Sequence, residues 1–422
     1  MYELERGCDM NQDVSILREL ANEYAQIAAE MEVKHVWGLH ADLNDLHPER
    51  PVVLIDELPW HELNADGFLT LRCEDPDFRR AEELLRKTVF RHRYFPGDML
   101  VKPYFPVEKV IHTTGIGVEV HEEIRATDAA NNIVSHRYEN QFDSIEDVEK
   151  LHNPVITYDA EASRSLCEKI SAAIGDILPV KLVGEASGYG LGHKAWDIIA
   201  MMMRVDNLLY ALVDEPEMMH ALVGKLTDIF IDTVRQYEAL NLLDADSAYC
   251  HCSSAASRDL LREPVDYQHV KAKNVWGRGL AQILATVSPA MHDEFEIEYA
   301  AKALAPFGLV YYGCCEPLDR KIDIVKKIPN LRKISITPWA DIRRAAEEVG
   351  GDYVISAKPN PANLPYAAEN PELIREEIRN IIDACRANGT PCEILLKDIS
   401  TAGYNLENLV VWNRVAMEEA QR

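Results

Sequence analysis

The fold is decided between Phe307 and Asp398, where one pattern occurs four times. In each copy a short apolar run is followed by an amphipathic stretch with helical spacing. The four apolar runs are FGLVYYG (307–313), RKISITP (332–338), DYVISAKP (352–359) and CEILLKD (392–398). Strands that alternate with helices are typical of a parallel sheet covered by helices, because parallel neighbours need a crossover connection.

The same alternation extends upstream to the run VVLI at residues 52–55. Roughly eight strand candidates in the whole chain favour a closed (β/α)8 TIM barrel over an open sheet. No linker rich in proline, glycine or serine divides the chain. We therefore predict a helical N-terminal extension at residues 1–50 and a TIM barrel at residues 51–422. The first helix is expected to start after the cap candidates Asn11 and Asp13.

The composition limits the classes of function. There are 44 Lys and Arg residues against 70 Asp and Glu residues, and the formal net charge is −26. Such a protein repels nucleic-acid backbones and anionic membrane surfaces, so neither is expected as a partner. No signal-peptide pattern and no apolar run of about 18 residues occurs, which favours a cytoplasmic protein. The nine scattered cysteines are an odd number and are expected as free thiols or metal ligands.

Active sites of TIM barrels lie at the carboxyl ends of the strands. Side chains that directly follow a predicted strand are therefore the site candidates. They are Asp56, Glu57, Glu185, Cys314, Cys315, Glu316, Trp339, Lys358, Asn360 and Asp398.

Five phrases together resemble the uroporphyrinogen decarboxylase superfamily, and within it the corrinoid-dependent methyltransferases of the O-demethylase type. The phrases are LVDEPEMMHALVGKLTD (212–228), SPAMHDEFEIEYAAKALAPFGLVYYGCCEPLD (288–319), ISITPWADIRRAAEEVG (334–350), ISAKPNPANL (355–364) and CEILLKDIST (392–401). The resemblance covers about residues 50 to 422. It implies a (β/α)8 barrel that passes the methyl group of a small methoxylated substrate, an aryl methyl ether, to the cobalt of a cobalamin or other corrinoid on a separate protein.

The decarboxylase activity itself is rejected. Where those enzymes carry a Met-Arg-Gln-Ala-Gly-Arg stretch, this chain has IDELPWHELN (55–64). A multiply anionic porphyrinogen would meet Asp56 and Glu57 instead of a cationic clamp.

The zinc motif of the thiol methyltransferases in this superfamily is also altered. Their His-x-Cys is replaced by Tyr312-Gly313-Cys314, and their final cysteine by the neighbourhood of Lys397, Asp398 and Ser400. Zinc accepts sulfur, nitrogen and oxygen ligands, and a catalytic site needs three of them. With these changes the resemblance implies zinc bound by Cys314 or Cys315, Glu316 and Asp398; the alternative is a site that has lost its metal. Neighbouring strand residues point to opposite faces, so only one of the two cysteines is expected to face the pocket.

An aryl methyl ether leaves a phenolate, whose conjugate acid has a pKa of ~10, as tyrosine does. A Lewis-acid metal or a positioned acid must stabilise that charge. For this role the resemblance implies Tyr312 and His292, with Glu185 beside them. Expected substrate contacts are Asp56, Glu57, His193, Trp339, Lys358 and Asn360. Expected partners are a corrinoid protein and a second copy in a homodimer. The alternatives are transfer from a methylcorrinoid to a thiol or folate, and a silent member that only binds a small molecule.

Two further motifs carry weaker predictions. In YCHCSS, Cys250 and Cys252 would share one face of a strand and His251 the other, so one metal takes all three only if the chain turns there. We expect a loop. The segment GEASGYGLGHKAW (184–196) matches no phosphate-binding pattern and is expected to be a loop at the barrel mouth, with Glu185 and His193 as wall residues.

Overall fold

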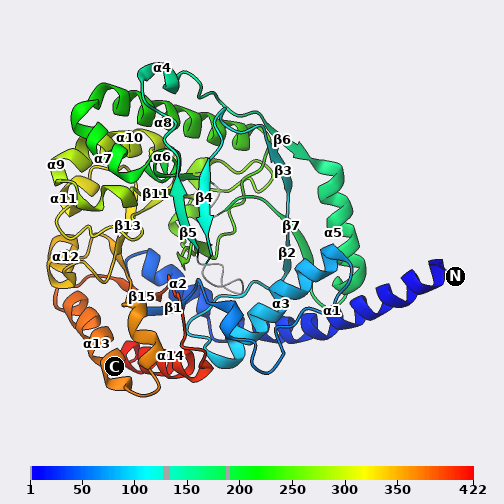
Figure 1. Cartoon of the computed structure of the whole chain (residues 1–422). Coiled ribbons are helices and arrows are strands. Elements are labelled where there is room, and N and C mark those ends of the chain that lie inside the picture. The colour runs from blue at the N-terminus through cyan, green and yellow to red at the C-terminus, as the bar shows by residue number, and fades with distance from the viewer. Residues whose placement is uncertain (1, 127–133, 187–190) are drawn as a thin grey trace.

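The computed structural model describes residues 2–126, 134–186 and 191–422, and its centre is a seven-stranded parallel sheet (Figure 1). The strands in spatial order are β1 (Val52–Ile55), β15 (Cys392–Leu396), β14 (Val354–Ala357), β13 (Leu331–Ile336), β12 (Leu309–Tyr312), β11 (Trp276–Gly279) and β8 (Gly192–His193). The α/β prediction is confirmed, and the four repeated runs form β12 to β15.

Two more parallel strands, β2 (Phe105–Glu108) and β7 (Val180–Val183), pair with each other. Within the described ranges no ladder joins this pair to the larger sheet. Closure into an eight-stranded barrel therefore stays a prediction. The first strand of the chain, β1, does pair with the last, β15, which is the neighbour relation that a closed barrel has.

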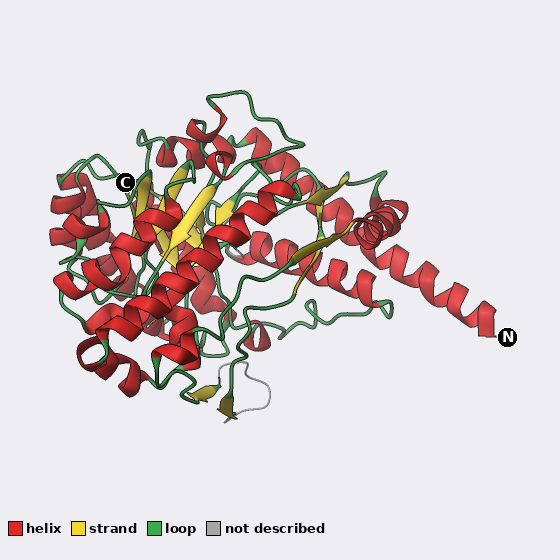
Figure 2. Ribbon diagram, turned by 90° about the horizontal axis from the view of Figure 1, so that it is seen from above, coloured by secondary structure: helices red, strands yellow, loops and turns green. Residues whose placement is uncertain are grey.

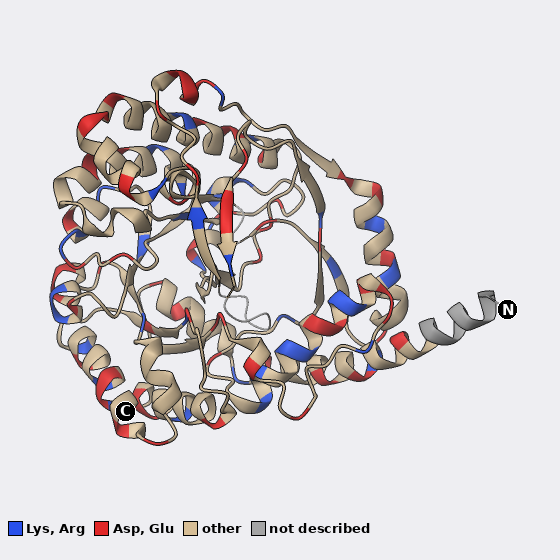
Figure 3. Cartoon of the chain, in the orientation of Figure 1, with Lys and Arg blue, Asp and Glu red and all other residues tan. Residues whose placement is uncertain are grey.

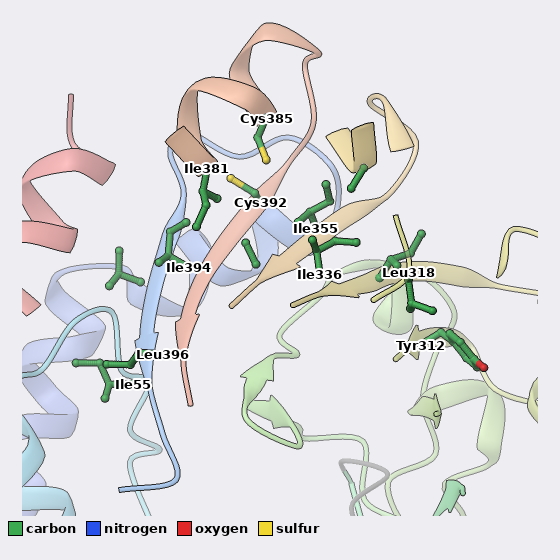
Figure 4. Close-up of a cluster of buried hydrophobic side chains, with 14 of the residues drawn as sticks. Ile55, Tyr312, Leu318, Ile336, Ile355, Ile381, Cys385, Cys392, Ile394 and Leu396 are labelled. Carbon is green, nitrogen blue, oxygen red and sulfur yellow. The ribbon is translucent and has the colours of Figure 1, made fainter. Parts of the chain in front are cut away.

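Helices surround the strands on the outside (Figures 1 and 2). They are α3 (Pro76–Tyr94), α5 (Ala160–Ile174), α6 (Ala195–Met202), α7 (Val205–Asp214), α8 (Pro216–Ala239), α9 (Pro289–His292), α10 (Glu298–Leu304), α11 (Ile322–Val325), α12 (Ile342–Val349), α13 (Pro371–Ala387) and α14 (Leu406–Ala420). A large apolar core fills the space between sheet and helices. Figure 4 shows part of it, where Ile355 and Ile394 of the sheet lie near Ile381 and Cys385 of α13.

The N-terminal segment consists of α1 (Tyr2–Val33) and α2 (Val36–Asn44). The predicted start of the first helix is wrong, since α1 already begins at Tyr2. Asp13 is not a cap: its buried carboxylate accepts the backbone N–H groups of Glu74 (3.1 Å) and Asp75 (3.0 Å). It fixes α1 to the turn before α3.

Small two-stranded antiparallel ladders accompany the parallel sheet. They are β3 (Val110–Thr113) with β6 (Ile156–Asp159), β4 (Glu122–Arg125) with β5 (Ser135–Tyr138), and β9 (Tyr249–Cys250) with β10 (Ser253–Ser254). A one-turn helix, α4 (Ile145–Val148), precedes β6. Acidic and basic residues are spread over the outer helices (Figure 3). No helix in the described ranges has an apolar stretch long enough to cross a membrane.

The β9–β10 hairpin lies against the inner face of the sheet, opposite the helices. Cys252 is buried with Val52, Leu54, Val354 and Leu395, and Cys250 is buried with Trp276, Leu309 and Tyr311. These strand residues alternate with others that face the helices. Gly279 is one of the positions that face the helices, because a Cβ added there would lie 2.8 Å from Leu304 of α10.

Candidate metal centre

The first and last strands bring two acids together. β1 is followed by Asp56 and Glu57, and β15 by Lys397 and Asp398. Because the two strands are neighbours, the N–H of Asp398 donates to Glu57 Oε2 (3.1 Å). The ammonium of Lys397 lies 3.2 Å from Glu57 and 3.1 Å from Asp398. Glu57 and Asp398 have positive φ angles of 49° and 55°, a conformation that strains non-glycine residues and is concentrated at functional sites.

The end of β12 adds the two adjacent thiols. Gly313 has a φ of 94° and turns the chain out of the strand, so the alternation of side chains no longer applies to the next residues. The sulfurs of Cys314 and Cys315 are 3.7 Å apart. Cys315 donates to Asp398 Oδ2 (3.3 Å), and Lys397 Nζ lies 3.6 Å from Cys314 Sγ. The expectation that only one of the two cysteines faces the site is wrong.

The hairpin supplies the remaining donors. Its strands are joined by a two-residue turn at His251 and Cys252, and His251 has a φ of 57°. This turn brings His251 Nδ1 to 3.4 Å from Cys252 Sγ. Glu57 Oε1 lies 3.4 Å from Cys252 Sγ and 3.5 Å from His251 Nε2. One ligand atom each from Glu57, His251 and Cys252 lie within 4.8 Å of one another, and they are the single such group of donors in the described part of the chain.

The position of the hairpin depends on a buried ion pair that the sequence reading missed. Lys333 Nζ and Glu393 Oε2 are 3.3 Å apart, and both side chains are fully buried. Glu393 accepts the Ser253 hydroxyl and the Ser254 N–H, while Lys333 donates to Ser253 Oγ (2.9 Å) and to the Ser254 carbonyl (2.7 Å). Burial opposes ionisation of Glu393, but Lys333 and the hydroxyls lower its pKa overall. Burial lowers the pKa of Lys333, and Glu393 opposes that effect. The paired side chains and their hydrogen bonds hold β10.

The two thiols of the strand loop differ in their ionisation. Hydrogen bonds with Cys315 and His251 lower the pKa of Cys314 against the effect of burial, and the cations Lys397 and Arg278 act in the same direction. The hydrogen bond to Cys314 raises the pKa of Cys315. Cys314 is therefore the more acidic thiol of the pair.

The hairpin thiol has the opposite tendency. Burial raises the pKa of Cys252, and the neighbouring acids Asp56 and Glu57 raise it further. A thiol must lose its proton to bind a metal, and a divalent cation among these acids reverses their effect. Without a bound cation, the surroundings of Cys252 therefore favour its protonated thiol. With a cation bound, they would favour its thiolate.

Glu316 does not join the donors, although it was predicted as a ligand. Its fully buried carboxylate accepts the backbone N–H groups of Ala281 (3.1 Å) and Cys314 (2.9 Å). Burial raises its pKa. Glu316 orders the loop that carries the cysteines.

The predicted acids Tyr312 and His292 meet each other, but away from the thiols. Tyr311 faces the hairpin, so Tyr312 faces the helices, where His292 Nε2 lies 2.8 Å from its hydroxyl. Lys321 lies 3.1 Å from His292 Nδ1, and Tyr312 donates to Glu296 (3.5 Å). Burial, with the Lys321 charge, lowers the pKa of His292 to about 3. A neutral imidazole that accepts from Lys321 and donates to Tyr312 fits this chain of contacts, which is structural and lies behind β12.

The other predicted contact residues are divided between several places. Lys358 is buried on the inner face and donates to the hydroxyl of Tyr311 (2.8 Å). His193 is buried on the helix side, 3.0 Å from Thr227 Oγ1 and 3.4 Å from Glu296.

Three further candidates have local roles. The Asp56 carboxylate accepts the N–H of Glu57 (2.7 Å), and Asn360 caps the short helix Pro361–Tyr366. The backbone of Glu185 pairs with the segment that leads to the hairpin. Trp339 is 70% exposed. Of the glycine-rich segment, residues 187–190 lie outside the described residues.

No protein-family model matches the chain, and no curated protein matches it in sequence.

Proposed function

We propose that this chain is a zinc-assisted methyltransferase that moves the methyl group of a small methoxylated aromatic substrate to the cobalt of a corrinoid protein. The observation that carries the proposal is the meeting of Glu57, His251 and Cys252, whose ligand atoms lie within 4.8 Å of one another. The donors come from a strand end and from the hairpin, so distant parts of the chain converge on one point.

The proposed fold is a (β/α)8 barrel. Pairing of β1 with β15 supports it, because the first and last strands of a closed barrel are neighbours. Glu57 then lies at the carboxyl end of a barrel strand, where barrel enzymes have their active sites, and the hairpin turn brings His251 and Cys252 to it. The resemblance to the uroporphyrinogen decarboxylase superfamily agrees with this architecture.

The donor set fits zinc. One carboxylate, one imidazole and one thiolate are three ligand types that zinc binds, and three protein ligands leave a position open for substrate. Bound there, zinc would act as a Lewis acid on the ether oxygen. Cys314 is a further sulfur at the same place, and Asp398 orients the group through Glu57 and Cys315.

In the proposed reaction the bond between the methyl carbon and the ether oxygen breaks. The bonding electron pair stays on the oxygen, which takes a proton from water and leaves as a phenol. Both electrons of the new carbon–cobalt bond come from the reduced cob(I) state of the corrinoid, the acceptor substrate. This chain contributes by ordering the donors. Burial lowers the pKa of Lys397, but its acidic neighbours raise it overall, so Lys397 keeps its proton. Its ammonium contacts Glu57, Asp398 and Cys314 and holds them around one point.

The test is incubation of the purified protein with cob(I)alamin and a panel of aryl methyl ethers, methylamines and methyl thiols, with methylcobalamin formation followed by absorbance. We expect methyl transfer from an ether. The variant His251→Ala should lose it, and the control Cys250→Ala, a buried hairpin cysteine outside the donor group, should keep it. If no donor yields methylcobalamin, the proposed activity is wrong; a methyl thiol as the sole donor would favour the thiol branch.

A further inference from the structure

Four cations are buried on the inner face of the sheet: Arg278 of β11, Lys333 of β13, Lys358 after β14 and Lys397 after β15. Two of them have acidic partners. Lys333 pairs with Glu393, and Lys397 contacts Glu57 and Asp398. Arg278 and Lys358 have no such partner in the described ranges. A buried cation without an anion is costly, so these two residues indicate that the site lacks an anion.

Arg278 is 6% exposed, and its Nε–H is buried without a hydrogen-bond partner among the described residues. No ion pair within that part of the chain includes its guanidinium. The ring of Tyr311 lies below it, with its centroid 5.9 Å from the guanidinium carbon. At least one N–H donor of this planar group is thus buried with no acceptor among the described residues.

Lys358 lies against the same aromatic ring, 5.4 Å from its centroid. It is 5% exposed, and its ammonium donates to neutral groups only, the hydroxyl of Tyr311 and both oxygens of Ser356. Burial lowers its pKa to about 8, and the nearby charge of Lys397 contributes. Cys314 acts electrostatically on both cations but forms no ion pair with either, and Glu393, which acts on Lys358, is paired with Lys333.

We propose that Arg278 and Lys358 form a binding site for a small carboxylate, which the substrate carries. A carboxylate matches the planar fork of a guanidinium with two parallel hydrogen bonds, and a lysine adds a second charge. The ring of Tyr311 lies within 5.9 Å of the Arg278 guanidinium carbon and within 5.4 Å of the Lys358 ammonium, so both cations adjoin the same aromatic side chain. Assignment of this carboxylate to the methoxylated substrate rests on the proposed function, but the binding site itself does not.

The test is isothermal titration of the purified full chain, without cobalamin, with benzoate and with benzamide, its neutral analogue of the same shape. We expect benzoate to bind at least tenfold more tightly than benzamide. Arg278→Gln should abolish this preference, and Arg278→Lys should recover only part of it because lysine lacks the fork. Arg320→Gln, which removes an exposed charge from the loop after Cys315, is the matched control and should bind as the wild type does.

Equal affinity for benzoate and benzamide would overturn the proposal, as would unchanged benzoate binding in Arg278→Gln with a native circular dichroism spectrum. Inorganic phosphate that competes as well as benzoate would overturn the assignment to a carboxylate. Methyl transfer is not needed for any of these readouts. Benzoate binding without methylcobalamin formation would therefore retain the site and reject the proposed activity.

Discussion

Removal of the buried lysine that holds the hairpin should destabilise the protein strongly. In Lys333→Met the hydrogen bonds to Ser253, the Ser254 carbonyl and Glu393 are lost. Glu393 then remains fully buried without the cation that neutralises it. Loss of one partner of a buried pair costs about 3–5 kcal/mol of the free energy of unfolding. Urea denaturation followed by tryptophan fluorescence measures this change.

The double variant Lys333→Met with Glu393→Gln separates charge from packing. It removes both charges, so it should be less destabilised than the sum of the two single variants, with a coupling of at least ~1 kcal/mol. Both single variants should also bind zinc more weakly, since Ser253 and Ser254 directly follow the turn that carries His251 and Cys252. A loss below ~1 kcal/mol in Lys333→Met, or strictly additive variants, would refute the view that this pair fixes the hairpin.

Three other predictions concern single positions. Gly313→Ala places a Cβ 2.6 Å from the buried Leu318, at a backbone φ of 94°. It should lower the free energy of unfolding by about 1–3 kcal/mol, measured by urea denaturation. It should also weaken zinc binding. Tyr312→Phe leaves His292 and Glu296 without a shared partner and should cost about 1–3 kcal/mol, but its zinc content should equal that of the wild type. Folding lowers the pKa of Lys358 from 10.5 to about 8. Between pH 8 and pH 10.5 the unfolded chain therefore binds more protons at this residue than the folded chain does. The contribution of Lys358 to the free energy of unfolding thus increases as the pH rises through this range. Relative to Lys358→Met, the wild type should therefore gain stability between pH 8 and pH 10, measured by urea denaturation; a flat difference would contradict the lowered pKa.

The parts of the fold that follow from local pattern were predictable. Each strand from β12 to β15 is a short apolar run, and its neighbours follow from the alternation with helices. The meeting of Cys314, Cys315 and Asp398 followed from their places after strands. The involvement of Glu57 was expected, but as a substrate contact.

Other parts depend on geometry that no local pattern contains. The sequence predicts a loop at YCHCSS, but it does not reveal that a two-residue turn between Cys250 and Ser253 brings His251 and Cys252 to Glu57. Tyr311 and Tyr312 are equally apolar neighbours, so the sequence does not reveal which one faces inward. One signal was available for the inner face: charged Lys333 and Glu393 interrupt otherwise apolar strands, which indicates a polar interior.

The central claim is that the hairpin and the strand ends hold one metal ion. The direct measurement is the zinc content of the chelator-treated protein after reloading and desalting, for the wild type, Cys252→Ala and the matched control Cys250→Ala. We expect about one zinc per chain in the wild type and in Cys250→Ala, and loss of zinc in Cys252→Ala, because a three-ligand site lacks one donor. No bound zinc in the wild type, or equal zinc in Cys252→Ala, would contradict the claim.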